Sequence, residues 1–474
     1  MSTSATTELV DAIWSHHIEP ALHDYIRIPN VSAAFDERWE EHGHMHEAVD
    51  LVRNWCATRP IAGLTVDVHE IPDHTPLIVM EIPAFNGGSN DDTVLMYGHL
   101  DKQPEMIGWR EGLGPWTPVV ENGKLYGRGG ADDGYSAFGS LAAIEVAQAI
   151  GMTHDRIVVL IEASEESGSP DLPLHLVQLR DRIGTPSLVI CLDSGALDDE
   201  HLWVTTSLRG IVVCTLTVQI LSEGVHSGEA SGIVPSSFRI IRQLLDRIED
   251  ATTGDVLLPE LQAETPPDRI EQARATAAEF PHPIAEHFPF VEGGRPMVDD
   301  PAAQLLANTW RPTVSYTGIA GIPDVHLAGN VLRPSTSLGL SIRLPPTCDH
   351  EAAKNALRHA LTVDPPYGAR VTVDNIASAP GWNAPVFAPW LDQALAVAST
   401  EHFGQPSRTF GEGGSIPFMG MLGKMFPEAQ FVVTGVLVPG SNAHGPNEFL
   451  DLAVARKITA CLTRILASHA SRHE

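Results

Sequence analysis

The chain has 474 residues, of which 43% are apolar and 19% charged, and this length predicts two or three domains rather than one. It carries 60 acidic and 30 basic side chains, a formal charge of −30, which argues against nucleic acid or an anionic membrane as a partner. No apolar run reaches the roughly 18 residues of a membrane span, and the N-terminus lacks a secretory pattern. The five cysteines are scattered, with no CxxC pair, so we expect a cytoplasmic protein without a disulfide framework.

The first 200 residues alternate apolar runs with helical stretches. Residues 92–101, 156–169 and 187–195 are apolar strands that end in acids, and residues 123–134 form a glycine-rich turn before a helix at 136–150. Strands that alternate with helices predict a mostly parallel sheet covered on both faces.

The pattern changes from about residue 207. A strand with one exposed face and an amphipathic helix are followed by a Pro- and Glu-rich stretch without clear periodicity, and then by a strand, a helix and a strand. These segments are, in order, residues 211–220, 236–250, 258–300, 337–346, 350–361 and 369–376. They predict a smaller α+β domain.

After about residue 382 the first pattern returns. A helix, a glycine-rich turn, a strand and a final helix are expected at 391–403, 410–417, 431–440 and 451–468. The simplest interpretation is a discontinuous α/β domain formed by 1–206 and 382–474, with a second domain, 207–381, inserted into it.

Acids and histidines recur where the apolar strands end. They are His99, Asp101, Asp132, Asp133, Glu165, Glu166, Asp193 and His444. Taken singly, an Asp after a strand is usually a helix cap or turn former, and a lone His is usually a hydrogen-bonded structural residue. In an open parallel sheet, however, the carboxyl ends of the strands line one edge, where ligands bind. The joint occurrence therefore predicts one site at that edge.

Two histidines and at least three carboxylates suit a pair of zinc, manganese or cobalt ions. Such a pair needs a bridging carboxylate, and Asp132, on a turn between strand and helix, is placed for that role. Glu165 and Glu166 are neighbours, so on an extended segment one would bind metal while the other faces the bridging water as general base. Asp101 lies two residues after His99, where it could orient a metal-bound imidazole.

The motifs GHLDKQP, GRGGADDG, EASEESGS, CLDSG, GVHSG and NAHGPNE resemble those of the M20 metallopeptidases. The string EESGS most resembles the branch of carnosinase and cytosolic nonspecific dipeptidase. The resemblance implies an α/β catalytic domain of the phosphorylase/hydrolase-like type with an inserted lid and dimerisation domain. It also implies two zinc or manganese ions per subunit, a homodimer, and hydrolysis of a small peptide with a free C-terminal carboxylate.

Carried onto this chain, the resemblance implies a role for each matching residue. His99 and Asp193 would bind one metal, Glu166 and His444 the other, and Asp132 both, with Glu165 as the general base and Asp101 supporting His99. His226 would act on the scissile carbonyl in the partner subunit. The substrate would be held by Asn330, Arg343, Glu412, Gly414 and Ser415. Each lid residue also has an ordinary explanation: Arg343 as a surface ion-pair residue, His226 as a turn former and Gly413–Gly414 as a helix-start turn.

One departure from the family pattern stands out. Many relatives carry a lysine after the Asp–Asp pair, whereas this chain has Gly134 followed by Tyr135. Two alternatives to a dipeptidase also remain open. The first is an N-acyl amino acid deacylase or deacetylase of the same family, and the second, more remote, is a non-catalytic homologue that binds small molecules.

Overall fold

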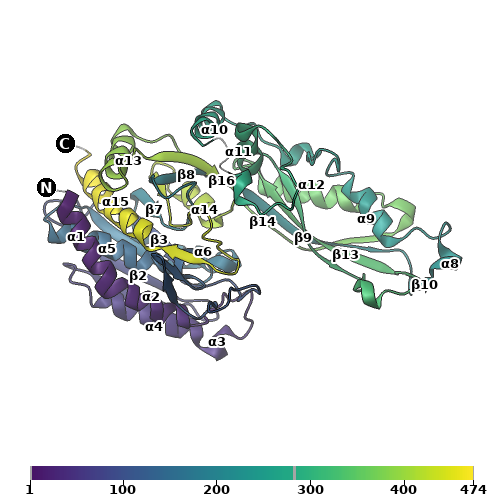
Figure 1. Ribbon diagram of the computed structural model, residues 1–474, viewed down its shortest axis with the longest axis horizontal. Helices are drawn as coiled ribbons and strands as arrows, with labels where there is room; N and C mark the ends of the chain where they lie inside the picture. The colour runs from purple at the N-terminus through teal and green to yellow at the C-terminus, as the bar shows by residue number, and fades with distance from the viewer. Residues whose placement is uncertain (1–2, 281–283, 473–474) are drawn as a thin grey trace. The chain divides into compact units, whose positions relative to one another are not determined.

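The computed structural model describes residues 3–280 and 284–472 and divides the chain into two compact units (Figure 1). The first unit comprises Met1–Thr206, Ala384–Phe410 and Leu422–Glu474, and the second comprises Ser207–Asn383 and Gly411–Met421. The chain leaves and re-enters the first unit at adjacent points, because the amide of Ala384 donates to the carbonyl oxygen of Thr206 at 2.9 Å.

A nine-stranded sheet runs through the first unit. Across the sheet the order is β1 (Thr65–His69), β2 (Leu77–Ile82), β6 (Arg156–Glu162), β3 (Thr93–His99), β7 (Pro186–Cys191), β17 (Gln430–Val433), β8 (Trp203–Leu208) and β15 (Trp382–Asn383), and β16 (Arg408–Glu412) also pairs with β8. The neighbours β6, β3, β7 and β17 are parallel, whereas β1, β2, β8 and β15 pair antiparallel. The sheet is therefore mixed, and the predicted parallel pairing is limited to its four central strands.

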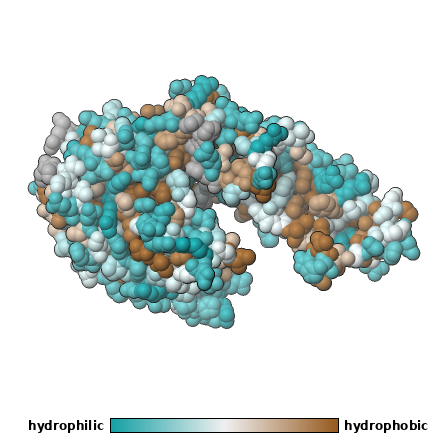
Figure 2. Space-filling view, viewed as in Figure 1, coloured by the Kyte–Doolittle hydropathy of each residue, from teal (hydrophilic) through white to brown (hydrophobic). Residues whose placement is uncertain are grey.

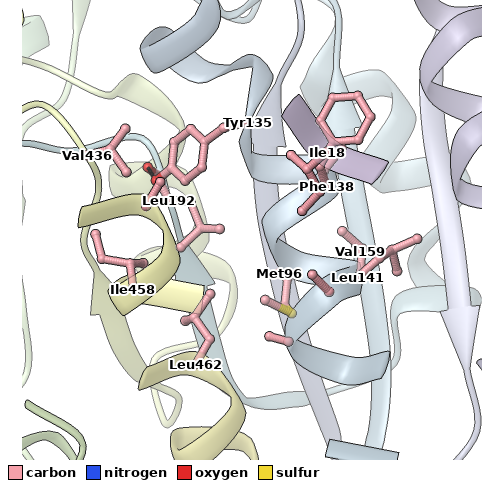
Figure 3. Packing of buried hydrophobic residues seen from close by; sticks show 14 of the residues in the cluster. Ile18, Met96, Tyr135, Phe138, Leu141, Val159, Leu192, Val436, Ile458 and Leu462 are labelled. Carbon is pink, nitrogen blue, oxygen red and sulfur yellow. Dashed lines mark hydrogen bonds between the residues drawn. The ribbon is translucent and has the colours of Figure 1, made fainter. Parts of the chain in front are cut away.

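Both faces of the central strands are covered, since every residue of β3 is buried. The helices of this unit are α1 (Thr3–Ile13), α2 (Glu19–Arg27), α3 (Trp39–His42), α4 (His44–Ala57), α5 (Ser136–Ala149), α6 (Leu172–Gln178), α7 (Arg180–Ile183), α13 (Pro389–His402) and α15 (Leu452–Ala470). Helix α5 is rich in Ala, Gly and Ser and is buried on nearly all sides, as expected of a helix without a polar face. Phe138 and Leu141 on α5, Leu462 on α15 and Met96 on β3 belong to one apolar cluster (Figure 3).

The first unit also contains a small three-stranded sheet, and two of the predicted motifs adjoin its strands. Its order is β18 (Phe449–Asp451), β5 (Lys124–Tyr126) and β4 (Val119–Glu121). Strand β5 leads into the turn η2 (Gly130–Gly134), and β18 follows the loop that holds His444. The pairing of β18 with β5 therefore joins two segments about 320 residues apart in the chain.

The second unit is built on an antiparallel four-stranded sheet. Its order is β11 (Thr313–Ala320), β13 (Ser335–Leu344), β9 (Gly210–Gln219) and β14 (Arg370–Ala379), and β10 (Val225–His226) pairs separately with β12 (Val331–Leu332). Burial alternates along β9 and β13, as expected of strands with one buried face. The helices are α8 (Ser227–Ala230), α9 (Ser237–Leu245), α10 (Pro267–Glu279), α11 (Pro301–Thr309) and α12 (His350–Thr362), and α14 (Pro417–Met425) crosses the boundary to the first unit.

Helix α10 lies within the stretch 258–300 for which the sequence predicted no element. Only Arg269, Ala273 and Thr276 of this helix are buried, so its apolar stripe is too short to leave a periodic pattern. In the part of the chain that the structure describes, no helix combines the length and apolarity that crossing a membrane requires.

Candidate metal centre and active site

The polar side chains predicted at strand ends gather at the carboxyl edge of the parallel strands. His99 is the last residue of β3, and Asp193 lies two residues beyond β7. Asp132 lies in the turn η2, and Glu166 lies in the short helix η3 (Glu165–Ser167) that follows β6. His444 lies in the loop between β17 and β18. The sequence predicted that β17 extends to residue 440, whereas it ends at Val433.

Two three-residue clusters form around the carboxylate of Asp132. In the first, His99 Nε2 lies 3.3 Å from Asp132 Oδ1 and 3.8 Å from Asp193 Oδ2. In the second, His444 Nε2 lies 3.1 Å from Asp132 Oδ2 and 3.4 Å from Glu166 Oε2. Each cluster has the spacing of a metal site. Asp132 thus presents one carboxylate oxygen to each cluster, the arrangement that two neighbouring cations require.

Asp101 organises the residues around the first cluster. Its carboxylate accepts hydrogen bonds from the backbone amides of Glu165 and Glu166, both at 3.0 Å. The prediction that these two acids lie on an extended segment is wrong, because capping by Asp101 and the positive φ of Gly168 close the segment into a helical turn. His99 Nδ1 lies 3.1 Å from the carbonyl oxygen of Asp101 and 3.4 Å from its carboxylate. Since a carbonyl only accepts, the ring proton is on Nδ1 and the Nε2 lone pair is free.

The buried atoms of the two clusters fit divalent cations. Among the described residues, His99 Nε2 and Glu166 Oε1 are buried without a hydrogen-bond partner. Burial, followed by the negative charge of Asp132, raises the pKa of Glu166 well above its usual range. Burial also disfavours the charged form of Asp132, but the neighbouring imidazoles of His444 and His99 outweigh it and lower the pKa of that carboxyl. Cations between these groups would offset the excess negative charge, and imidazole with carboxylate suits zinc or manganese.

Three buried polar residues at the site received no role from the sequence: Asp133 was noted only as a strand-end acid, and Arg128 and Glu448 were not singled out. Asp133 Oδ2 accepts a hydrogen bond from the backbone amide of His99 at 3.2 Å and so fixes the end of β3. Arg128 and Glu448 form an ion pair that is 1% and 0% exposed at its two side chains. Both lie inside the motifs that carry the resemblance, GRGGADDG and NAHGPNE. The position of Arg128, a charged residue in a glycine-rich turn, could have indicated its role in the site.

In the second unit, two predicted substrate residues contact each other. Arg343 NH1 donates to the hydroxyl of Ser415 at 2.7 Å, and that hydroxyl donates to the carbonyl oxygen of Arg209 at 2.5 Å. The side chain of Arg209, another residue that the sequence did not indicate, donates to the carbonyl oxygen of Gly413 at 2.9 Å, and its amide donates to that of Gly414 at 3.0 Å. Burial, followed by the positive charge of Arg343, lowers the pKa of Arg209 to about 9.

The remaining predicted residues of the second unit lie in two places. Glu412 ends β16 and is half-buried, beside the turn that holds Ser415. His226 and Asn330 are exposed and belong to the small β10–β12 ribbon, where the amide of Ser227 donates to the carbonyl oxygen of Asn330 at 2.9 Å. His226 Nδ1 accepts from the amide of Gly228 at 3.1 Å, so the ring proton is on Nε2.

Two ligand clusters that share one carboxylate, with an unshared acid beside them, define the class of two-metal hydrolases. The chain belongs to peptidase family M20/M25/M40, whose model matches residues 95–468. This match confirms the predicted family and the predicted class of enzyme, a metal-dependent hydrolase of peptide bonds.

Two relatives that match the chain are dipeptidases by name. The chain is 28% identical over 434 residues to a cysteinylglycine-S-conjugate dipeptidase of Corynebacterium striatum, covering 87% of each chain. It is 28% identical over 308 residues to the Beta-Ala-His dipeptidase of Mus musculus, covering 63% of this chain and 61% of that one.

Solved structures agree on the fold. The dipeptidase Dug1p of Saccharomyces cerevisiae is similar with a TM-score of 0.79 at 20% identity, covering 100% of this chain and 99% of that one. Human carnosine dipeptidase 1 is similar with a TM-score of 0.76 at 19% identity, covering 99% of this chain and 100% of that one. These likenesses confirm the predicted α/β fold class.

Proposed function

We propose that the chain hydrolyses the amide bond of dipeptides and dipeptide-like substrates with a free C-terminal carboxylate, using two zinc or manganese ions per subunit. The observation that carries this proposal is the position of Asp132, whose two carboxylate oxygens belong to two separate ligand clusters. His99 and Asp193 would complete one metal position, and Glu166 and His444 the other.

Glu165 is the general base of the proposed reaction. When bound, the two cations acidify the attacking water and polarise the scissile carbonyl. Burial, followed by the negative charge of Asp193, raises the pKa of Glu165 well above its usual range in the metal-free protein. Glu165 would take the proton of the attacking water. The same carboxyl then donates the proton to the departing amine. Asp101 supports both His99 and Glu165 through the hydrogen bonds described above.

The substrate carboxylate would bind in the second unit. Arg209 is buried and Arg343 is half-buried, and among the described residues neither has a carboxylate partner. Burying two positive charges without a nearby anion costs free energy. A bound anionic ligand would offset that cost. A terminal carboxylate can accept from Arg343, from the Ser415 hydroxyl and from backbone amides near Gly414. We also propose that Glu412 and Asn330 contact the substrate.

We further propose a homodimer formed through the second unit. Strand β11 is at the end of its sheet, and Tyr316 and Ile319 on this strand and Phe238 on α9 are 49%, 52% and 43% exposed. They line a cavity of about 600 Å³, and apolar side chains gather on the surface of this unit in the space-filling view (Figure 2). Proteins normally cover an exposed apolar edge strand. In a two-fold dimer, the same strand of the second subunit would cover it.

In such a dimer, His226 would serve the active site of the partner subunit. Its protonated Nε2 is available as a donor to the oxyanion, since Nδ1 accepts from Gly228. The exposed apolar side chains of Ile233, Val325 and Leu327, at 82%, 93% and 69%, lie in segments that adjoin this ribbon in the chain. They support the proposal that this part of the second unit is covered in the working enzyme. Segments 1–206 and 382–474, apart from the turn Gly411–Met421 that belongs to the second unit, would form the catalytic domain, and 207–381 the lid and dimerisation domain of a cytoplasmic enzyme.

A matched set of substrates tests the proposed function. Metal-free protein is given zinc or manganese and then Ala-Gly, Ala-Gly amide or N-acetylglycine, with Glu165→Gln as the inactive control. We expect rapid cleavage of Ala-Gly alone, because the amide cannot pair with Arg343 and the acetyl compound lacks the free amine. The named relatives are dipeptidases, which favours this outcome over a deacylase. Preferential cleavage of N-acetylglycine would establish the deacylase, and equal cleavage of Ala-Gly and its amide would disprove the carboxylate site.

A further inference from the structure

The loop that supplies His444 has an unfavourable backbone. Asn442, His444 and Asn447 have φ angles of +54°, +64° and +61°. Residues other than glycine are uncommon in this left-handed region, where the Cβ atom approaches the backbone. Such conformations persist only where the surroundings hold them. The loop therefore needs contacts from outside itself to keep the imidazole in place.

Arg128 supplies those contacts. Its NH2 group donates to the carbonyl oxygens of His444 at 3.1 Å and Gly445 at 2.8 Å. Its NH1 group donates to Glu448 Oε2 at 2.5 Å. The guanidinium thus holds three acceptors of one loop, and because it is planar its donors are fixed relative to one another.

Glu448 connects the same loop to the glycine-rich turn. Its Oε1 accepts from the backbone amide of Gly129 at 2.9 Å, and its carbonyl oxygen accepts from the amide of Gly127 at 3.1 Å. Arg128 lies between these two glycines and four residues before Asp132. The Arg128–Glu448 pair therefore connects the segment that carries Asp132 to the segment that carries His444. A buried pair whose partners are this fully hydrogen-bonded is disrupted at high cost when one member is removed.

We propose that Arg128 and Glu448 are positioning residues that set the affinity of one of the two metal positions, the one formed by Asp132, Glu166 and His444. The inference rests on the proposed function, because it assigns metal binding to these side chains. The position formed by His99 and Asp193 shares Asp132 with the first, but His99 is held by Asp101 and Asp133, so this position depends less on the pair.

The test is a metal titration that resolves the two equivalents. Zinc binding to metal-free Arg128→Lys, Arg128→Met and Glu448→Gln is measured by calorimetry and by metal analysis after dialysis. Partners that orient a metal ligand typically contribute roughly 10–100-fold to metal affinity. We expect one equivalent to weaken by that factor and the other, which shares only Asp132 with it, to weaken much less. The lysine variant keeps the charge but loses the planar fork, so it should weaken the same equivalent.

A second buried ion pair provides the control. Arg59 and Glu145 form a pair with two hydrogen bonds, at 2.8 and 3.0 Å, with side chains 8% and 12% exposed, and neither residue belongs to the proposed ligand set. Arg59→Met should lower stability while leaving both zinc equivalents unchanged. His444→Ala identifies the affected equivalent. Adding Arg128→Met to His444→Ala should then cause no further metal loss, because the two changes act on one position.

The outcomes separate the inference from the proposed function. If wild-type protein binds two equivalents and the variants weaken both equally, or neither, the inference is overturned and the proposed function stands. If wild-type protein binds no divalent cation, both are overturned. If circular dichroism shows that Arg128→Met does not fold, Glu448→Gln decides between these outcomes instead. That variant preserves the shape of the side chain and the acceptor for Gly129.

Discussion

The replacement of Gly134 by alanine is expected to destabilise the protein through one steric conflict. A Cβ atom at position 134 would lie 2.2 Å from Tyr25 Cε1 and 2.5 Å from the carbonyl oxygen of Gly129. Tyr25 is fully buried, and its hydroxyl donates to the carbonyl oxygen of Leu100 at 2.5 Å. Tyr25 thus occupies the space beside the Asp–Asp turn, at the position where the sequence departs from the lysine of the family pattern. Overpacking of this kind costs about 1–3 kcal/mol.

A second glycine nearby is expected to respond in the opposite direction. A Cβ atom on Gly139, inside α5, would meet nothing closer than Thr459 Oγ1 at 3.6 Å, an ordinary contact. Alanine is favoured over glycine in a helix by about 1 kcal/mol, so Gly139→Ala should raise the free energy of unfolding. Melting temperatures of the two metal-free variants and the wild type are compared by calorimetry, which avoids stabilisation by bound cations. A Gly134→Ala protein as stable as the wild type would refute the steric argument.

Three further predictions concern the chemistry. Removal of metal by a chelator should abolish activity, and zinc or manganese should restore it; full activity with verified metal loss would contradict the mechanism. Glu165→Gln should keep both metals and lose most of its rate, whereas Glu166→Gln should lower the metal content, and equal metal loss in both would contradict these roles. Inactive His226→Ala and Glu165→Ala chains, mixed after subunit exchange, should regain activity at about a quarter of their sites; no recovery would place His226 in its own active site.

The sequence predicted the parts of the fold that depend on local pattern. The strands that end near His99 and Asp193 are buried and apolar throughout, so they were recognisable, and their polar ends indicated one site edge. The antiparallel pairing of β1 and β2 was not predicted, because strand direction depends on connections rather than on the alternation of apolar residues. Helix α10 was missed because its buried side is narrow.

Long-range polar pairs were the other omission. Arg128 and Glu448 are 320 residues apart in the chain, and nothing in the local spacing of either residue indicates its partner. Arg209 follows a buried strand and looks like an ordinary strand-end cation, whereas its contacts with Gly413 and Ser415 come from a distant segment. Residues that hold the ligands in position are in general harder to predict than the ligands themselves, because side chains of several types can make the same supporting contacts.

The position of β17 has a consequence for how the protein is made. This strand fills the place between β7 and β8, yet the ribosome must add residues 209–429 before it exists. At roughly 5–20 residues per second, that delay is on the order of tens of seconds. During this time β7 and β8 each have an unpaired inner edge, and such edges recruit other chains. The nascent protein therefore carries two unpaired strand edges in its main sheet until β17 has been synthesised.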